Sequence, residues 1–338
     1  MQNKHLILRV SLVLGLSLAV MMSFAGCSVR AEAQTIPENP PIGPEVPNEP
    51  GQTSRSKVYF TSDISPAGLM AVYNALGQQP SGRVAVKLST GEPPNSNYLR
   101  PALIKDLVQS VKGTIVESNT AYGGRRANTA MHKQVAKDHG YTDIATVDIL
   151  DENGSVSLPV RSGTRLKENF VGANFKNYDY FIVLSHFKGH MMAGLGGAIK
   201  NISIGIASSE GKAWIHTAGK SKSNPWGGEQ NAFLDSMAEA GKSVVDSLNG
   251  KILYINVMNR LSIDCDCNGN PAAPDMHDIG ILSSLDPVAL DQACVDLIYA
   301  APDGRRLIQR MESMNGIRAI DHGAEIGLGS KAYELIKL

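Results

Sequence analysis

The stretch YFIVLSHFKGHMMAGLGGAIKN, residues 180–201, decides the fold. Its first part, Tyr180–Ser185, is mostly apolar and predicts a buried β-strand. A glycine-rich polar turn follows, and Lys200 and Asn201 come next on a predicted helix. In an open parallel sheet, ligands bind beyond the carboxyl ends of the strands. The stretch therefore predicts an α/β fold whose ligand site lies directly after this strand.

Strand and helix patterns alternate along the chain on both sides of this stretch. The other expected strands are Lys57–Thr61, Arg83–Leu88, Gly113–Ser118, Thr146–Leu150 and Ile252–Met258. The expected helices are Pro66–Leu76, Tyr98–Val111, Asn128–His139, Ala232–Leu248 and Pro287–Ala300. Such alternation predicts a mostly parallel sheet with helices on both faces, either as one domain or as two lobes around a cleft.

The N-terminal segment is typical of an exported lipoprotein. Two basic residues precede a mostly apolar run, residues 12–24, which is shorter than the roughly 20 residues of a membrane span. The sequence FAGC at residues 24–27 resembles a bacterial lipobox. We predict that residues 1–26 are a signal peptide and that Cys27 is lipidated. The protein is then expected on the extracytoplasmic face of the bacterial cell envelope, with the membrane as a partner through the lipid on Cys27.

Residues 27–56 contain six prolines and scarcely any large apolar side chains. Such a segment cannot bury enough surface to fold, and its prolines keep it extended. We predict a disordered tether over residues 27–56 and a single folded α/β region over residues 57–338.

The overall charge and the cysteine count exclude several functions. Lys+Arg and Asp+Glu number 32 each, so the charge balance provides no basis for nucleic-acid binding and favours a small molecule or a protein as the partner. Lipidation of Cys27 would leave three of the four cysteines. An odd number does not imply a disulfide scaffold, and three thiolates cannot by themselves supply the usual four ligands of an iron–sulfur cluster.

Titratable side chains gather in and after the deciding stretch. His186, Lys188 and His190 alternate, so a continuing strand would point all three to one face. Imidazole and ammonium groups beside glycines suit an anion, a metal ion or proton transfer. The alternative is that the histidines cap loops and the glycines pack helix on strand. The candidate residues are His186, Lys188, His190, Gly196, Gly197, Lys200, Asn201 and His216.

Two further groups follow predicted strands. Cys265 and Cys267 lie among acidic residues and could bind a soft metal, although their spacing is not a common zinc pattern. They could equally be free thiols in a tight loop, whereas Cys294 is expected in the core. Arg125, with Arg126 beside it, could hold a carboxylate or phosphate, or form surface ion pairs.

Several motifs resemble the family called domain of unknown function 362. They are residues 186–190 (HFKGH), 196–201 (GGAIKN), 265–267 (CDC) and 278–291 (DIGILSSLDPVALD). The chain is also distantly similar to lactate racemase, in which two histidines and a lysine have the spacing of His190, Lys200 and His216. That resemblance implies an acid/base role for His190, contact with a nickel-pincer nucleotide for Lys200 and nickel ligation for His216. The racemase's second acid/base histidine has no counterpart in the loop at residues 123–126, so the resemblance implies fold and site location but no reaction.

These observations lead to three hypotheses of function. The first is an extracytoplasmic enzyme of unknown reaction that holds an anionic small molecule, with His190 and Lys200 as catalytic residues and His216, Cys265 and Cys267 as candidate metal ligands. The second is a lipoprotein that captures a metal or small ligand without chemistry. The third is a thiol or iron–sulfur-linked redox protein that uses Cys265 and Cys267. The cofactor is unknown, with a metal ion as the candidate.

Overall fold

The structure is a computed structural model that describes residues 55–161 and 163–338. The predicted signal peptide, Cys27 and nearly all of the predicted tether lie outside these residues. The described residues belong to one compact unit and do not divide into two lobes. Within the described ranges, no helix combines the length and apolar character needed to cross a membrane.

The core of the fold is an eight-stranded sheet with the strand order β12-β1-β11-β10-β7-β2-β3-β4. The strands are β1 (Ser56–Thr61), β2 (Val84–Lys87), β3 (Thr114–Glu117), β4 (Val147–Ile149), β7 (Tyr180–His186), β10 (Ile252–Met258), β11 (Gly280–Ser284) and β12 (Tyr333–Lys337). Every neighbouring pair is parallel except the two that include β11. The predicted mostly parallel α/β fold is confirmed.

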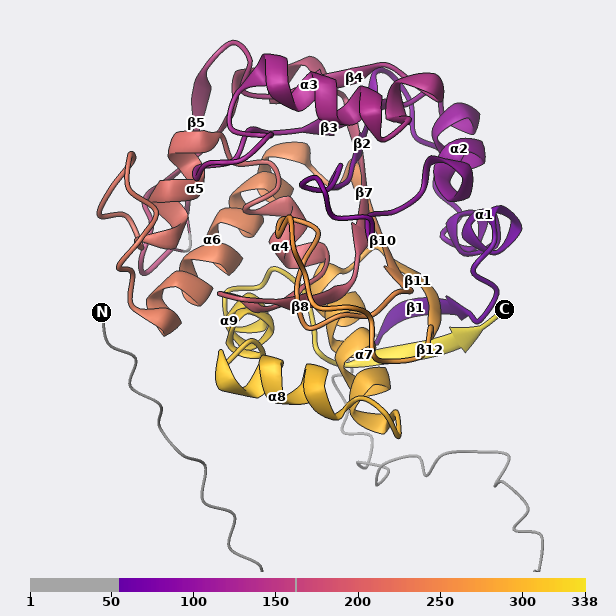
Figure 1. Ribbon diagram of the computed structural model, residues 1–338. Coiled ribbons are helices and arrows are strands. Elements are labelled where there is room, and N and C mark those ends of the chain that lie inside the picture. The colour runs from indigo at the N-terminus through magenta and orange to yellow at the C-terminus, as the bar shows by residue number, and fades with distance from the viewer. Residues whose placement is uncertain (1–54, 162) are drawn as a thin grey trace, which may run out of the picture. The chain divides into compact units, whose positions relative to one another are not determined.

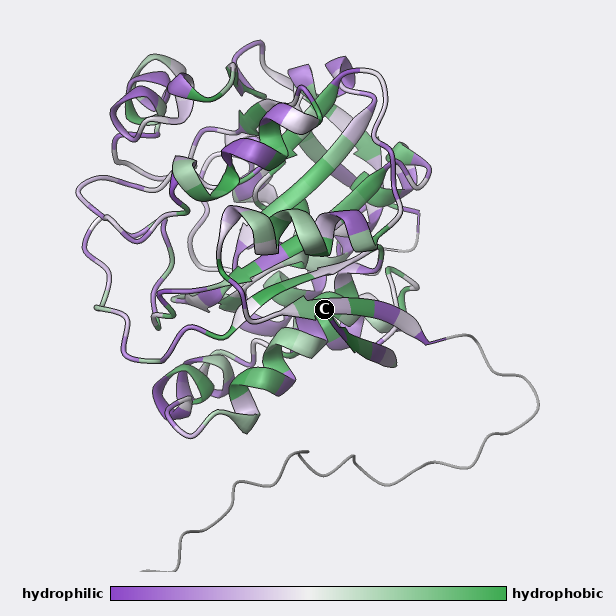
Figure 2. Ribbon diagram, turned by 90° about the vertical axis from the view of Figure 1, so that its right-hand side faces the viewer, coloured by the Kyte–Doolittle hydropathy of each residue, from purple (hydrophilic) through white to green (hydrophobic). Residues whose placement is uncertain are grey.

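Helices cover both faces of this sheet, with α1 and α2 on one side and α4 and α6 on the other (Figure 1). The helices are α1 (Pro66–Ala75), α2 (Pro101–Ser110), α3 (Thr129–Asp138), α4 (Ala198–Ile202), α5 (Ser209–His216), α6 (Gln230–Leu248), α7 (Pro287–Ala300), α8 (Arg305–Ser313) and α9 (Arg318–Glu325), with 3₁₀ turns at Tyr141–Asp143 and Ala173–Asn177. Figure 2 shows hydrophobic residues concentrated on the central strands, with most of the hydrophilic residues on the surrounding helices and loops.

Alternate residues of each central strand serve the two cores. Phe181 and Val183 of β7 pack with α4, α6 and α7, whereas Ile182 and Leu184 pack with α1 and α2. Because both faces are buried, the strand is apolar throughout, as parallel strands between two helical layers must be.

Two short antiparallel hairpins lie outside the main sheet. They are β5 (Ser155–Pro159) with β6 (Glu168–Gly172), and β8 (Lys188–His190) with β9 (Gly194–Gly196). The second hairpin corrects one expectation, because β7 ends at His186 and the chain leaves the sheet at Phe187 before β8 begins. His186, Lys188 and His190 therefore do not belong to one continuous strand.

The order of the strands places a ligand site at a defined point. From β2 the chain moves outward to β3 and β4, and it then returns to the other side of β2 to form β7. The reversal leaves a crevice beyond the carboxyl ends of β2 and β7, which is where ligands bind in open α/β sheets.

Candidate functional site

A cavity of about 100 Å³ opens at this crevice. The strands β2, β3 and β7 end in Lys87, Glu117 and His186, so each delivers an ionisable side chain to the same edge of the sheet, and all three line the cavity. The volume is smaller than the roughly 150 Å³ of a cavity that holds benzene, so the enclosed part suits a small head group. The charged lining consists of Lys87, Arg126, Lys188, Lys200 and Lys212 with the carboxylates of Glu117 and Asp266.

Most of these charges are paired with one another. Lys87 Nζ lies 3.3 Å from Glu117, and Arg126 bridges Glu117 at 3.0 Å and Glu92 at 3.1 Å. Asn201 accepts a hydrogen bond from Lys87 Nζ at 3.0 Å and so helps to orient it. Buried charges need such partners because desolvation otherwise favours their neutral forms.

A second ionic group joins the hairpin β8–β9 to the loop after β10. Asp266 accepts hydrogen bonds from His186 Nδ1 at 3.0 Å and from the ammonium of Lys188. Although burial opposes ionisation, these two partners hold the pKa of the Asp266 carboxyl well below its usual value. Gly189 lets the loop approach, because a Cβ there would lie 2.3 Å from the carbonyl oxygen of Ile263.

Lys200 and Lys212 differ from the other cations of the cavity. Among the described residues, neither has a carboxylate within 4.0 Å of its ammonium, and Lys212 Nζ donates only to the Ala207 carbonyl, at 2.6 Å. Burial, together with the nearby charges of Lys87 and Arg126, lowers the pKa of Lys200 to about 8. Burial also lowers the pKa of Lys212 to about 7. The cavity therefore contains two lysine ammonium groups that have no direct carboxylate partner among the described residues.

Lys200 owes its position to a short helix that is capped from a distance. The Asp291 carboxylate accepts hydrogen bonds from the Ala198 and Ile199 amides at 2.7 and 2.9 Å, which occupies the N-terminus of α4. Asp291 can approach only because residue 197 is glycine, since a Cβ there would lie 2.3 Å from the carboxylate oxygen. An anion in the cavity would thus meet the side chain of Lys200 and not the amides of this helix.

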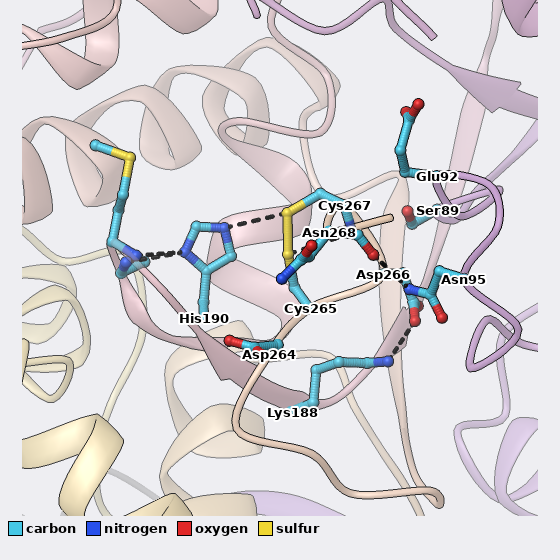
Figure 3. Close-up of a disulfide and its surroundings, with 12 residues drawn as sticks. Ser89, Glu92, Asn95, Lys188, His190, Asp264, Cys265, Asp266, Cys267 and Asn268 are labelled. Carbon is cyan, nitrogen blue, oxygen red and sulfur yellow. Dashed lines mark hydrogen bonds and ion pairs between the residues drawn. A yellow bond between two sulfur atoms is a disulfide. The ribbon is translucent and has the colours of Figure 1, made fainter. Parts of the chain in front are cut away.

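Two cysteine side chains, Cys265 and Cys267, also line the cavity. Cys265 and Cys267 are joined by a disulfide, so the expectation of free thiols is wrong (Figure 3). His190 Nε2 lies 3.6 Å from Cys267 Sγ. The donor atoms of His190, Cys265 and Cys267 lie within 4.8 Å of one another, so these side chains could hold a metal ion once the disulfide is reduced.

The tautomer of His190 follows from its neighbours. The amides of Met192 and Ala193 donate to Nδ1 at 3.1 and 2.9 Å, so Nδ1 accepts and the ring proton resides on Nε2, which faces the sulfur. Burial, with Lys200 and His216 nearby, holds the pKa of His190 well below its usual value. In this arrangement His190 is a neutral hydrogen-bond donor toward Cys267.

A family model described as domain of unknown function (DUF362) matches residues 84–296, well over half of the chain. The chain belongs to the DUF362 family. No curated protein matches it. The sequence resemblance to this family is therefore confirmed.

Two solved structures are similar to this DUF362 protein. The lactate racemase apoprotein from Thermoanaerobacterium thermosaccharolyticum shares 17% identity at a TM-score of 0.38, over 60% of this chain and 51% of that one. A protein from Thermotoga maritima shares 11% identity at a TM-score of 0.39, over 77% and 58%. The chain thus spans little more than half of each structure. At TM-scores this low, the likeness assigns no role to any residue.

The DUF362 structure brings most of the sequence-predicted residues to the cavity. Its lining includes His186, Lys188, Gly196, Gly197, Lys200, Asn201, Cys265 and Cys267. His216 is buried on α5, where its ring stacks on Phe233 and its Nδ1 donates to the Lys212 carbonyl, and it is not part of the group formed by His190 and the two cysteines. Arg125 is exposed and contributes its amide to Glu92, whereas its neighbour Arg126 is buried and lines the cavity.

Three charged residues of the site were not predicted from the sequence. Lys87 and Glu117 each end a short strand that is otherwise apolar or β-branched, and an ionisable residue at that point is a signal that could have been used. Lys212 lies on α5. Its neighbours in the cavity include Glu117, which is more than 90 positions away in the sequence, and the local sequence around Lys212 does not indicate that the two residues meet. Two charged residues of the loop between β10 and β11 form ion pairs and do not line the cavity: His277 pairs with Asp303, and Asp275 with Arg306.

Proposed function

We propose that this protein binds a small anion, a carboxylate or phosphate group, in the cavity at the carboxyl ends of β2, β3 and β7. The observation that carries the proposal is the pair of ammonium groups, Lys200 and Lys212, that lack a direct ion-pair partner among the described residues and lie on the wall of a small cavity. A bound oxyanion would accept charge-assisted hydrogen bonds from both ammonium groups. Its negative charge would serve as the ion-pair partner that the described side chains do not provide.

Calorimetric titration tests this proposal with sulfate, phosphate, malonate and phosphate monoesters. Lys200→Met should weaken binding of the best anion by about 10- to 100-fold, because a hydrogen bond to a charged group contributes about 1.5–3 kcal/mol. Lys105→Met is the matched control, since Lys105 is exposed on α2 and does not line the cavity. Equal affinities of the wild type and the Lys200→Met variant would refute the proposal.

Substitution of Lys200 can distinguish the hypothesis of an enzyme from that of a capture protein. A lysine whose pKa is about 8 can gain or lose a proton near neutral pH, which suits a general acid or base. Lys200→Arg keeps the positive charge but removes this proton exchange. If the protein is an enzyme, Lys200→Arg retains ligand binding but abolishes conversion of the bound ligand as followed by NMR. Stoichiometric binding without conversion in the wild type would favour the capture protein.

We also propose that the protein acts outside the cytoplasm, anchored through a lipid on Cys27. The order of charged, apolar and small residues before Cys27, followed by the proline-rich stretch, supports this proposal. Labelling of cells with a radioactive fatty acid should mark the full-length protein. Cys27→Ser should abolish the label and release the protein from the membrane fraction, and persistence of either would contradict the proposal.

A further inference from the structure

The Cys265–Cys267 disulfide is poorly suited to a purely stabilising role. A disulfide stabilises mainly by constraining the unfolded chain, and the effect grows with the length of the loop that it closes. Here the bond encloses only Asp266. That residue is already fixed by its contacts with His186 and Lys188.

Each sulfur instead has a hydrogen-bond donor directed at it. The amide of Cys267 donates to Cys265 Sγ at 3.3 Å, and His190 presents its Nε2 proton to Cys267 Sγ at 3.6 Å. Donors of this kind stabilise the thiolates that form when a disulfide is reduced. The proton on Nε2 also means that this nitrogen has no lone pair for a metal ion in the present tautomer, which favours thiol chemistry over metal binding.

The disulfide is also reachable from the cavity. Cys265, Cys267 and Lys200 all line it, and Cys267 is the more exposed of the two cysteines. A molecule held by its anionic group at Lys200 would therefore lie in the same cavity as the disulfide.

We propose that Cys265 and Cys267 form a redox centre that exchanges with small thiols and disulfides carrying a carboxylate. The preference for a carboxylate rests on the anion site proposed above, whereas the exchange itself rests on the sulfur geometry. This inference names both a reaction and a substrate class for the cavity.

The reaction balances with two thiols as the reductant. A thiolate attacks Cys267 Sγ, the Cys265–Cys267 bond breaks, and Cys265 leaves as a thiolate beside the Cys267 amide. A second thiolate attacks the substrate sulfur of the mixed disulfide and releases Cys267 as a thiolate beside His190 Nε2–H. Two electrons pass from two substrate thiols to the protein, which becomes a dithiol while the substrate becomes a disulfide, and each thiolate takes up a proton from solvent according to its pKa.

The test follows reduction of the full-length protein by a matched pair of thiols, 3-mercaptopropionate and 3-mercaptopropanol. Samples are quenched with acid and alkylated, and mass spectrometry of the peptide containing Cys265 and Cys267 measures the fraction reduced, so that Cys27 and Cys294 do not contribute. We expect the acidic thiol to react at least tenfold faster per thiolate than the neutral one. The preference should fall below threefold in Lys200→Met and persist in Lys105→Met.

His190→Leu and His190→Gln test the donor at Cys267. In the reduced protein, thiolate absorbance near 240 nm should titrate at higher pH in His190→Leu, and His190→Gln should restore part of the difference because its amide can donate. A disulfide that neither thiol reduces in the native protein would overturn the proposal. So would stoichiometric zinc binding by the reduced protein with no thiol exchange. Reduction at equal rates by both thiols would refute the substrate class and leave calorimetry to decide the anion site independently.

Discussion

At the scale of single residues, burial with incomplete pairing distinguishes this site. Lys87, Arg126 and Lys188 each have a carboxylate partner, whereas Lys200 and Lys212 have none within 4.0 Å in the part of the chain that the structure describes. Buried cations without a direct carboxylate partner are unfavourable for folding, which is the physical basis of the anion site proposed above.

The lowered pKa values give anion binding a defined pH dependence. In the free protein Lys200 and Lys212 lose their protons near pH 8 and pH 7, and a bound anion would raise both pKa values. Binding is therefore strongest below about pH 7 and weakens as the pH rises through 7 to 9. The dissociation constant should increase by up to about tenfold per pH unit for each lysine above its pKa. Calorimetry with sulfate, which stays fully ionised over this range, measures the effect, and a pH-independent affinity would contradict it.

Sequence could identify the residues near the cavity but not how they are paired. The alternation after Tyr180 located His186 and Lys188, and the glycines located Lys200. The partners of these residues come from strands and loops far away in the chain, such as Asp266, 78 positions beyond Lys188. Which of two adjacent arginines turns inward depends on Glu92 and Glu117, and local sequence cannot contain that information.

At the scale of elements, the strands and helices that alternate from β1 to β4, with β7, α6, β10 and α7, were predictable from the sequence, whereas the two hairpins, β11, β12 and the helices α5, α8 and α9 were not. All of the strands and helices expected from alternation are present, and α7 begins at Pro287 with Asp286 as its N-cap, as its sequence indicates. The hairpin β8–β9 was missed because three-residue strands containing glycine have no recognisable period. The strand β11, which is antiparallel to β10, was not expected at all, because five apolar and small residues show no clear strand pattern.

Because Asp291 caps helix α4, alanine substitutions at the adjacent residues Gly196 and Gly197 should differ in their effect on stability. Gly197→Ala places a Cβ about 2.3 Å from the Asp291 carboxylate, whereas Gly196→Ala meets nothing closer than Lys200 Cδ at 3.5 Å. We expect Gly197→Ala to reduce the free energy of unfolding by about 2–4 kcal/mol, through overpacking and loss of the cap, and Gly196→Ala to change it by less than about 1 kcal/mol. Urea denaturation measures both values. Equal effects of the two substitutions would show that Asp291 does not hold the helix as described.

At the scale of the whole molecule, the two ends of the described chain share one sheet edge. β1 pairs with β12 on one side and with β11 on the other, so Val58 faces both Leu335 and Ser284. Apolar residues of β12, such as Tyr333, pack against the hydrophobic core between the sheet and the helices α4, α6 and α7. The C-terminal strand is therefore an integral part of the sheet.

Removing β12 should destabilise the entire fold. A chain ending at Ser330 loses the ladder to β1 and the packing of Tyr333 and Leu335, and we expect the free energy of unfolding to fall by about 2–4 kcal/mol at about 0.5–1.5 kcal/mol per hydrogen bond. Glu334→Gln, an exposed change within the strand, is the control. A truncated chain as stable in urea as the full chain would contradict the pairing described for β12.

The same pairing controls when the protein can fold during its synthesis. β1 is the first strand of the sheet to leave the ribosome, but its two neighbours, β11 and β12, are among the last segments to be made. Contacts over more than 200 residues form slowly, and the nascent chain cannot complete this part of its sheet before β11 and β12 have been synthesised. This delay is compatible with the export proposed above, because a chain whose sheet is still open can be translocated in the unfolded state.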